Sequence, residues 1–247
     1  MSASGVRPLD PSRSRPDTPL VGVPGLGLSA ATLRPVLHRL GGGTVVTLPG
    51  FGEPVPRHLP VDPQTQAGRL LDRVTELGID TCVLLGHSAS CQVVVEAAAR
   101  APGVVAALVL IGPTTDPRAR TRSRLAARWL RTSVHERPAQ VPLLVRDYAR
   151  TGPTAMVRTM GAARRHRIET ALVGVSCPVL VLRGPRDRIS PADWTDTLAR
   201  VAPHGASTTL ESGAHMVPLT EPDALAAAIG AFLRTAADGR VTGHPAA

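Results

Sequence analysis

Short apolar runs alternate along this chain of 247 residues with longer segments in which apolar residues recur at helical spacing. Most of the short runs are apolar throughout, which is typical of strands that are buried on both faces. Such strands belong to a parallel sheet covered by helices on both sides. The pattern therefore predicts an α/β fold with a mostly parallel sheet. The strands are expected at 20–23, 44–48, 81–85, 104–111, 178–182 and 207–210.

Between these strands, apolar spacing predicts helices over 29–40, 64–77, 89–100, 192–201 and 223–233. One long interruption, about 114–175, is rich in arginine and prone to helix, and it has no strand signal. We interpret it as a helical lid inserted into the domain at 20–236. Residues 1–19 carry four prolines and predict a flexible arm. Residues 237–247 predict a flexible tail.

All 28 basic residues are arginine, and the formal net charge is +9. Thirteen of these arginines lie in 116–167, against only three carboxylates, Asp116, Glu136 and Asp147. A nucleic-acid interface would interleave such charge with aromatic residues or set it on a known module. Aromatics make up only 2% of the chain, so we expect no nucleic-acid partner. The arginines are either a solvated helix face or a surface that steers an acidic partner, such as a phosphopantetheine-bearing carrier protein.

The chain shows no apolar run of roughly 18 residues, the length needed to span a bilayer, so no membrane span is expected. Residues 1–18 lack the apolar core of a secretory signal. The three cysteines, Cys82, Cys91 and Cys177, are odd in number and have no metal-type spacing. We therefore expect a cytoplasmic protein with reduced thiols.

The strongest chemical signal is a serine at the junction of an apolar strand and a helix, in the run Gly86-His87-Ser88-Ala89-Ser90. A nucleophile on such a sharp turn has a strained backbone, so its neighbours two positions away must be small. Gly86 and Ser90 meet this requirement. The Ala89 N–H would lie at a helix N-terminus, where it can stabilise an oxyanion. Ser88 is therefore the candidate nucleophile.

A serine nucleophile needs a histidine base, and the base needs a carboxylate that holds its tautomer. Asp187 and His215 each follow a predicted strand, in the chain order Ser, Asp, His. Because active sites of open α/β sheets lie at the carboxyl ends of the strands, all three residues are expected at one edge. Asp116, after the preceding strand, is an alternative acid. His87 is interpreted as a packing neighbour of the turn.

These pieces, taken in order, resemble the α/β-hydrolase superfamily over about residues 20–235. The matching motifs are Pro24-Gly25-Leu26-Gly27, Leu48-Pro49-Gly50-Phe51-Gly52, the Ser88 turn, Gly184-Pro185-Arg186-Asp187 and Gly213-Ala214-His215. The resemblance implies that Leu26 gives the second oxyanion N–H. It also implies a lid and no metal or organic cofactor.

The chain departs from the family pattern at three places. Pro24-Gly25 replaces the usual His-Gly of the oxyanion loop, and Ser90 replaces a glycine. The N-terminal arm is too short and too rich in proline for the family's opening antiparallel strands. A reduced sheet of about six strands is therefore expected.

The expected function is hydrolysis of a carboxylic ester, lactone or thioester of small-molecule size, through an acyl-enzyme on Ser88. Three alternatives stay open: carbon–carbon bond hydrolysis, an acyltransferase or cyclase of specialised metabolism, and a ligand-binding member without turnover. The candidate pocket residues are large side chains near the expected site: Phe51, Trp129, Leu130, Tyr148, Met156, Met160 and Met216.

Overall fold

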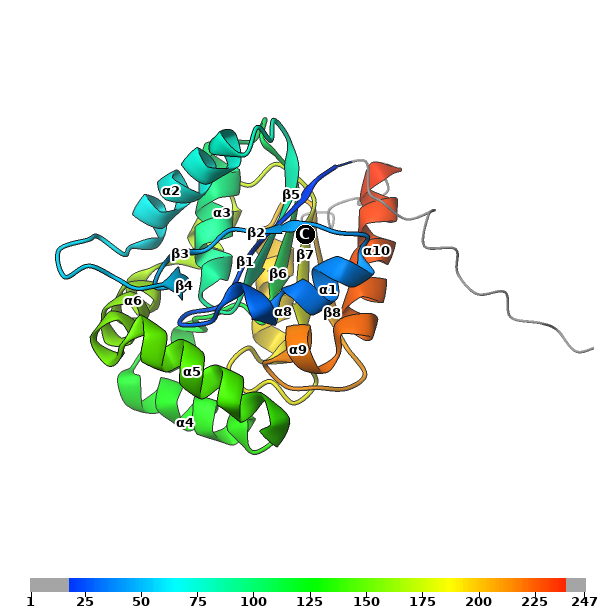
Figure 1. Ribbon diagram of the computed structural model, residues 1–247. Coiled ribbons are helices and arrows are strands. Elements are labelled where there is room, and N and C mark those ends of the chain that lie inside the picture. The colour runs from blue at the N-terminus through cyan, green and yellow to red at the C-terminus, as the bar shows by residue number, and fades with distance from the viewer. Residues whose placement is uncertain (1–17, 239–247) are drawn as a thin grey trace, which may run out of the picture.

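A computed structural model of the chain describes residues 18–238, and the fold is a six-stranded sheet with helices on both faces (Figure 1). The strand order is β2-β1-β5-β6-β7-β8, and every pair in it is parallel. The six strands are β1 (Leu20–Val23), β2 (Thr44–Val45), β5 (Cys82–His87), β6 (Val105–Ile111), β7 (Val179–Arg183) and β8 (Gly205–Thr209). The predicted fold class and strand number are confirmed.

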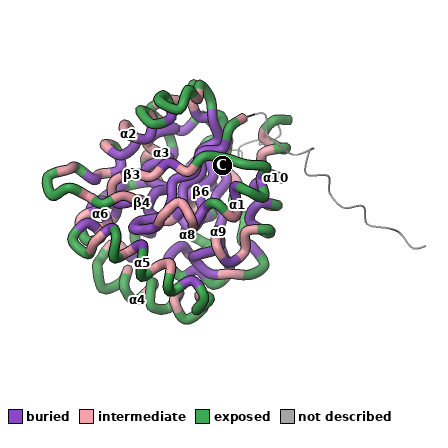
Figure 2. Tube along the Cα trace, viewed as in Figure 1, coloured by how far each residue is buried: buried purple, intermediate pink, exposed green. Residues whose placement is uncertain are grey.

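Side chains along the four central strands, β1, β5, β6 and β7, alternate between two buried cores, one on each face of the sheet. On β5, for example, Leu84 joins one core while Val83 and Leu85 join the other. The first core lies under α2 (Pro63–Glu76), α3 (Ser90–Arg100), α7 (Ile168–Leu172) and α8 (Ala192–Val201). The second lies under α1 (Arg34–Arg39), α9 (Val217–Thr220) and α10 (Pro222–Ala237). Figure 2 shows the strands buried between these layers.

Two predicted elements are divided in the structure. The helix expected over 29–40 becomes a 3₁₀ turn (Ala30–Thr32) followed by α1. Pro35 lies in the first turn of α1, where its missing N–H is tolerated, so a new helix begins there. The strand expected over 44–48 keeps only β2, and the chain then forms two short strands, β3 (Leu48–Pro49) and β4 (Gly52–Glu53).

The segment expected to form a lid is helical and lies between β6 and β7 in the chain. It contains α4 (Arg122–Ser133), α5 (Val141–Thr151), α6 (Pro153–Arg165) and α7, with 3₁₀ turns at Pro117–Ala119 and Pro138–Gln140. In Figure 1, α4 and α5 lie beyond the ends of the strands, at the edge where β1 finishes. We call residues 114–175 the insertion.

No helix within residues 18–238 has the length and apolar character needed to cross a membrane. The predicted arm and tail lie almost wholly outside the described residues.

Candidate active site

Ser88 occupies the turn between β5 and α3 with a backbone φ of +59°. Among the described residues it is the one non-glycine residue with positive φ, and glycines occupy the other ten such positions. A left-handed backbone is unfavourable for a residue with a Cβ. The Ser88 N–H donates to the Ile111 carbonyl at 2.8 Å, so the adjacent strand β6 holds the turn in place.

The turn is tight because its two flanking positions leave no room for larger side chains. A Cβ at Gly86 would lie 2.7 Å from Val94 Cγ2 and 2.9 Å from Cys91 Cα. Ser90 is fully buried; its hydroxyl accepts from the His87 N–H at 2.8 Å and lies 2.8 Å from the Val23 carbonyl oxygen. The hydroxyl of Ser90 thus ties the turn to β1, a link that glycine could not make.

Ser88, His215 and Asp187 form a continuous hydrogen-bonded chain. The Ser88 hydroxyl and His215 Nε2 lie 2.8 Å apart, and His215 Nδ1 lies 2.7 Å from Asp187 Oδ2. Asp187 is fully buried, His215 is 9% exposed and Ser88 is half-buried. With Nδ1–H donating to the carboxylate, Nε2 is free to accept the serine proton.

The loop after β7 fixes the Asp187 carboxylate. Its Oδ1 accepts from the Ile189 and Ser190 amides at 2.8 and 3.0 Å. Burial opposes its ionisation, but the charge and hydrogen bond of His215 and these two amides outweigh burial and lower the pKa of Asp187. Arg183, a buried residue at the end of β7, donates to the Asp187 carbonyl at 2.8 Å and supports the loop from below. Asp187 is therefore an anion in a fixed position.

The rings of His215 and His87 are neighbours, but their pKa values are shifted in opposite directions. Their ring centroids are 5.1 Å apart, and His87 Nε2 lies 3.0 Å from the His215 carbonyl oxygen, to which it donates. Burial and the nearby charge of His215 lower the pKa of His87 to about 3, so it is neutral near pH 7. Burial also opposes protonation of His215, but the Asp187 carboxylate and Glu136 outweigh it and raise the pKa of His215.

Two backbone amides flank the serine. Neither the Leu26 nor the Ala89 N–H donates a hydrogen bond to any residue within 18–238. Ala89 directly precedes the eleven-residue helix α3, whose N-terminus attracts negative charge. The loop bearing Leu26 packs closely against the serine turn: a Cβ at Gly25 would lie only 2.9 Å from His87 Nδ1. Its support comes from the Gly27 N–H, which donates to the Gly50 carbonyl at 2.8 Å.

The predicted pocket residues lie in different surroundings. The space beside Gly27 is filled by Tyr148 and Met156, so these two lie at the loop that carries Leu26. Phe51 belongs to the first core, with Met160 packed against that core, and Met216 is buried beside His215. The side chains of Trp129 and Leu130 on α4 are exposed, at 52% and 62%. Their role in substrate binding stays a prediction.

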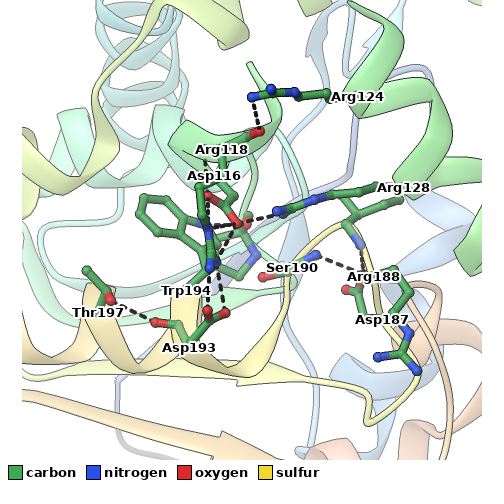
Figure 3. A network of polar contacts seen from close by, with 12 residues as sticks. Asp116, Arg118, Arg124, Arg128, Asp187, Arg188, Ser190, Asp193, Trp194 and Thr197 are labelled. Carbon is green, nitrogen blue, oxygen red and sulfur yellow. Dashed lines mark hydrogen bonds and ion pairs between the residues drawn. The ribbon is translucent and has the colours of Figure 1, made fainter. Parts of the chain in front are cut away.

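Asp116, the alternative acid, is engaged elsewhere. It is 1% exposed, and its carboxylate accepts from Arg118 at 2.8 Å and from Arg128 at 2.6 Å (Figure 3). Arg118 also pairs with Asp193 at the start of α8. The structure thus brings Asp187, and not Asp116, to His215.

The sequence interpretation missed two residues that support the site. Glu136, in the insertion, accepts hydrogen bonds from the His215 and Met216 amides at 2.7 and 2.9 Å. No spacing or motif marks a contact between segments 79 residues apart. Arg183 did carry a signal, because it is a charged residue directly after four apolar strand residues. Within the described part of the chain, no cluster of His, Cys, Asp or Glu is arranged to hold a metal ion.

Comparisons with known proteins agree on the fold. The model of the alpha/beta hydrolase family matches residues 20–228. A thermophilic esterase from Thermogutta terrifontis, with malate bound, has a TM-score of 0.75 at 23% identity, covering 90% of this chain and 92% of that one. An enol-lactonase from Burkholderia xenovorans has a TM-score of 0.69 at 18% identity, covering 89% and 92%.

A curated relative shares a shorter stretch. The (E)-2-((N-methylformamido)methylene)succinate hydrolase of Acinetobacter baylyi is 41% identical over 61 residues, which is 25% of this chain and 23% of that protein. The match therefore spans less than a quarter of the relative's length.

Proposed function

The chain belongs to the alpha/beta hydrolase family and is an enzyme of that family. We propose that it is a serine hydrolase that uses no cofactor. Its substrate is a carboxylic ester, lactone or thioester of small-molecule size, cleaved through an acyl-enzyme on Ser88. The observation that carries this proposal is the hydrogen-bonded chain from Ser88 through His215 to Asp187, combined with the left-handed backbone of Ser88.

In the proposed mechanism, Ser88 Oγ attacks the substrate carbonyl while its proton moves to His215 Nε2. The Asp187 carboxylate stabilises the imidazolium that forms and keeps Nδ1 protonated. His215 then gives the proton to the leaving group, and the acyl group stays on Ser88. A water molecule, deprotonated by His215, attacks the acyl-enzyme. The bond to Ser88 Oγ then breaks, His215 returns the proton to that oxygen, and the acid leaves.

The tetrahedral intermediates carry a negative oxygen. The Leu26 and Ala89 amides are its proposed donors, since neither has an acceptor within the described residues. Donors that are already in place stabilise a developing oxyanion without reorganisation. Loss of one such donor typically lowers kcat by roughly 10²–10³-fold.

The short similarity to the A. baylyi enzyme favours a second candidate, hydrolysis of a substrate that bears carboxylates. That enzyme's name specifies a succinate derivative, and the net positive charge of this chain would attract such a substrate. Carbon–carbon bond hydrolysis, acyl transfer and cyclisation would use the same serine. A panel of esters, lactones, thioesters, amidomethylene succinates and β-diketones separates these activities.

The proposed partner of the arginine-rich insertion is an acidic carrier protein. Seven exposed arginines of the insertion form no ion pair with a described residue: Arg122, Arg124, Arg131, Arg146, Arg150, Arg165 and Arg167. Charge of one sign on a surface speeds association with the opposite sign and is weakened by salt. Turnover of a carrier-bound acyl group that is insensitive both to salt and to charge reversal at Arg122 and Arg131 would remove this partner. The proposed location is the cytoplasm, consistent with three free, buried cysteines.

Labelling with a fluorophosphonate probe, read by intact mass, tests the proposed function. We expect one adduct on the wild-type protein, none on Ser88→Ala, and one on Ser207→Ala, a control on the exposed strand β8. Absence of an adduct on folded wild-type protein would contradict the proposal and favour a binding protein without turnover. An adduct that persists in Ser88→Ala would place the nucleophile elsewhere.

A further inference from the structure

One carboxylate of the insertion contacts the backbone of the proposed base. Glu136 lies between α4 and the 3₁₀ turn at Pro138–Gln140. Its Oε1 accepts from both the His215 and the Met216 amides, and its Oε2 accepts from Gln140 Nε2 at 2.9 Å. Gln140 is buried, so the carboxylate is held on one side by the insertion and on the other by the His215 loop.

The two amides have a particular need for this acceptor. Residues 215 and 216 directly precede the short helix α9, and amides at the start of a helix have no acceptor within it. Both residues are buried. A buried N–H without an acceptor is unfavourable, so the contact with Glu136 stabilises the loop in its present position.

Neighbouring residues of the insertion make two further contacts with the same edge of the sheet. Thr132 Oγ1 accepts from the amide of Arg188, the residue after Asp187, at 3.0 Å. Arg137 pairs with Glu221 at 2.6 Å, and Glu221 in turn accepts from Ser212 at 2.8 Å. Residues 132–137 therefore contact both the loop of the proposed acid and the loop of the proposed base.

From this geometry we propose that Glu136 is a positioning residue, which holds the His215 ring toward Ser88 only while the insertion is docked on the His215 loop. The inference rests on the proposed function, because it assigns to His215 the role of base. Movement of the insertion away from the sheet removes the acceptor of two amides beside the base. Docking of the insertion and assembly of the catalytic geometry are then one event.

The charge of Glu136 has a separate, measurable effect. The titratable groups that face His215 are Asp187, Glu136 and the neutral His87. Replacement of Glu136 by glutamine keeps an acceptor oxygen but removes the negative charge. Stabilisation of the imidazolium by Glu136 is then lost, while the contact with the loop is kept.

The test begins without substrate. In Glu136→Ala we expect amide hydrogen exchange at His215 and Met216 to become at least tenfold faster. Amide exchange in the strands of the sheet should be unchanged. In Glu136→Gln we expect little change in exchange but a His215 pKa lowered by about half a unit, read by NMR titration. The matched control is Glu169→Gln, an insertion carboxylate that pairs with Arg120 and does not contact this loop.

The second measurement is the rate of fluorophosphonate labelling at Ser88. We expect a fall of about 10–100-fold in Glu136→Ala, because displacements of about 1 Å have effects of this size, with the melting temperature unchanged beyond a few degrees. Unchanged amide exchange at His215 and Met216 in Glu136→Ala would show that Glu136 does not stabilise this loop, and would overturn the proposal. Faster exchange with a wild-type labelling rate overturns the positioning role. If wild-type protein is not labelled at all, the proposed function fails and the positioning role fails with it.

Discussion

The loops that follow β6 and β7 each hold an aspartate that is at most 1% exposed, yet the two carboxylates have different partners (Figure 3). Asp116 accepts hydrogen bonds from Arg118 and Arg128. Asp187 accepts from two amides of its own loop and from His215. Burial opposes the ionisation of both carboxylates. The hydrogen bonds and charge of the arginines outweigh burial at Asp116, the charge and hydrogen bonds of its partners do so at Asp187, and the pKa of each is lowered.

The comparison teaches that burial and a lowered pKa do not identify a catalytic acid. The two aspartates are distinguished by the side chain that donates a hydrogen bond to each carboxylate. Arg128 belongs to α4, so Asp116 joins the insertion to the sheet. His215 is also hydrogen-bonded to Ser88, so Asp187 belongs to the chain of side chains through which the proposed proton transfer runs. The same type of side chain at two neighbouring strand ends thus anchors the insertion in one loop and orients the proposed base in the other.

The largest difference is expected in catalysis. Asparagine at 187 can keep the loop amides satisfied but favours the wrong tautomer of His215, so Asp187→Asn should lower the rate of Ser88 labelling by about 10³–10⁴-fold. Asp116→Asn should lower it by less than tenfold. The two rates are measured with the same probe under the same conditions. Comparable losses in both variants would break the distinction between the two loops.

The second-largest difference is expected in how activity depends on pH in the variants of the two aspartates. If neutral His215 is the base, as proposed, activity should rise with pH through the His215 pKa, which is raised above 6.5 in the wild-type protein. Asp187→Asn removes the anion that favours the imidazolium, so the acid limb should move to lower pH. Asp116 pairs with Arg118 and Arg128 and makes no hydrogen bond to His215, so Asp116→Asn should leave the acid limb in place. A limb displaced equally in both would contradict this.

Asp116 should matter more to stability than to chemistry. Asp116→Ala leaves two guanidinium groups without their shared carboxylate, and the free energy of unfolding should fall by about 1–3 kcal/mol. Urea denaturation at pH 7 measures the change. The variant should also expose the insertion to limited proteolysis. Full wild-type stability would show that the insertion is held by other contacts.

The smallest effect is expected at Asp193, which also pairs with Arg118 but has a side chain that is 62% exposed. Exposed pairs of this kind stabilise proteins by about 0–1 kcal/mol. Asp193→Ala should therefore change the free energy of unfolding less than Asp116→Ala does, in the same urea experiment. The reverse order would show that burial of Asp116 adds nothing to the network.

Local patterns predicted the sheet well because its four central strands, β1, β5, β6 and β7, are apolar runs that are buried on both faces. The edge strands β2 and β8 are partly exposed. Local patterns also predicted the edge at which Ser88, Asp187 and His215 meet, since that edge follows from the direction of parallel strands. They could not choose between Asp116 and Asp187 by anything except order in the chain. The contact of Glu136 with His215 depends on how the insertion docks, and no periodicity encodes that.

The left-handed backbone of Ser88 bears on how such a chain evolves. A non-glycine residue held there is strained by about 1–3 kcal/mol, and glycine would relieve the strain. A mutation to glycine at this position would therefore make the protein more stable while it removes the hydroxyl. In a lineage freed from selection for turnover, thermodynamics would favour loss of this serine, and the inactive descendant would be the hardier protein.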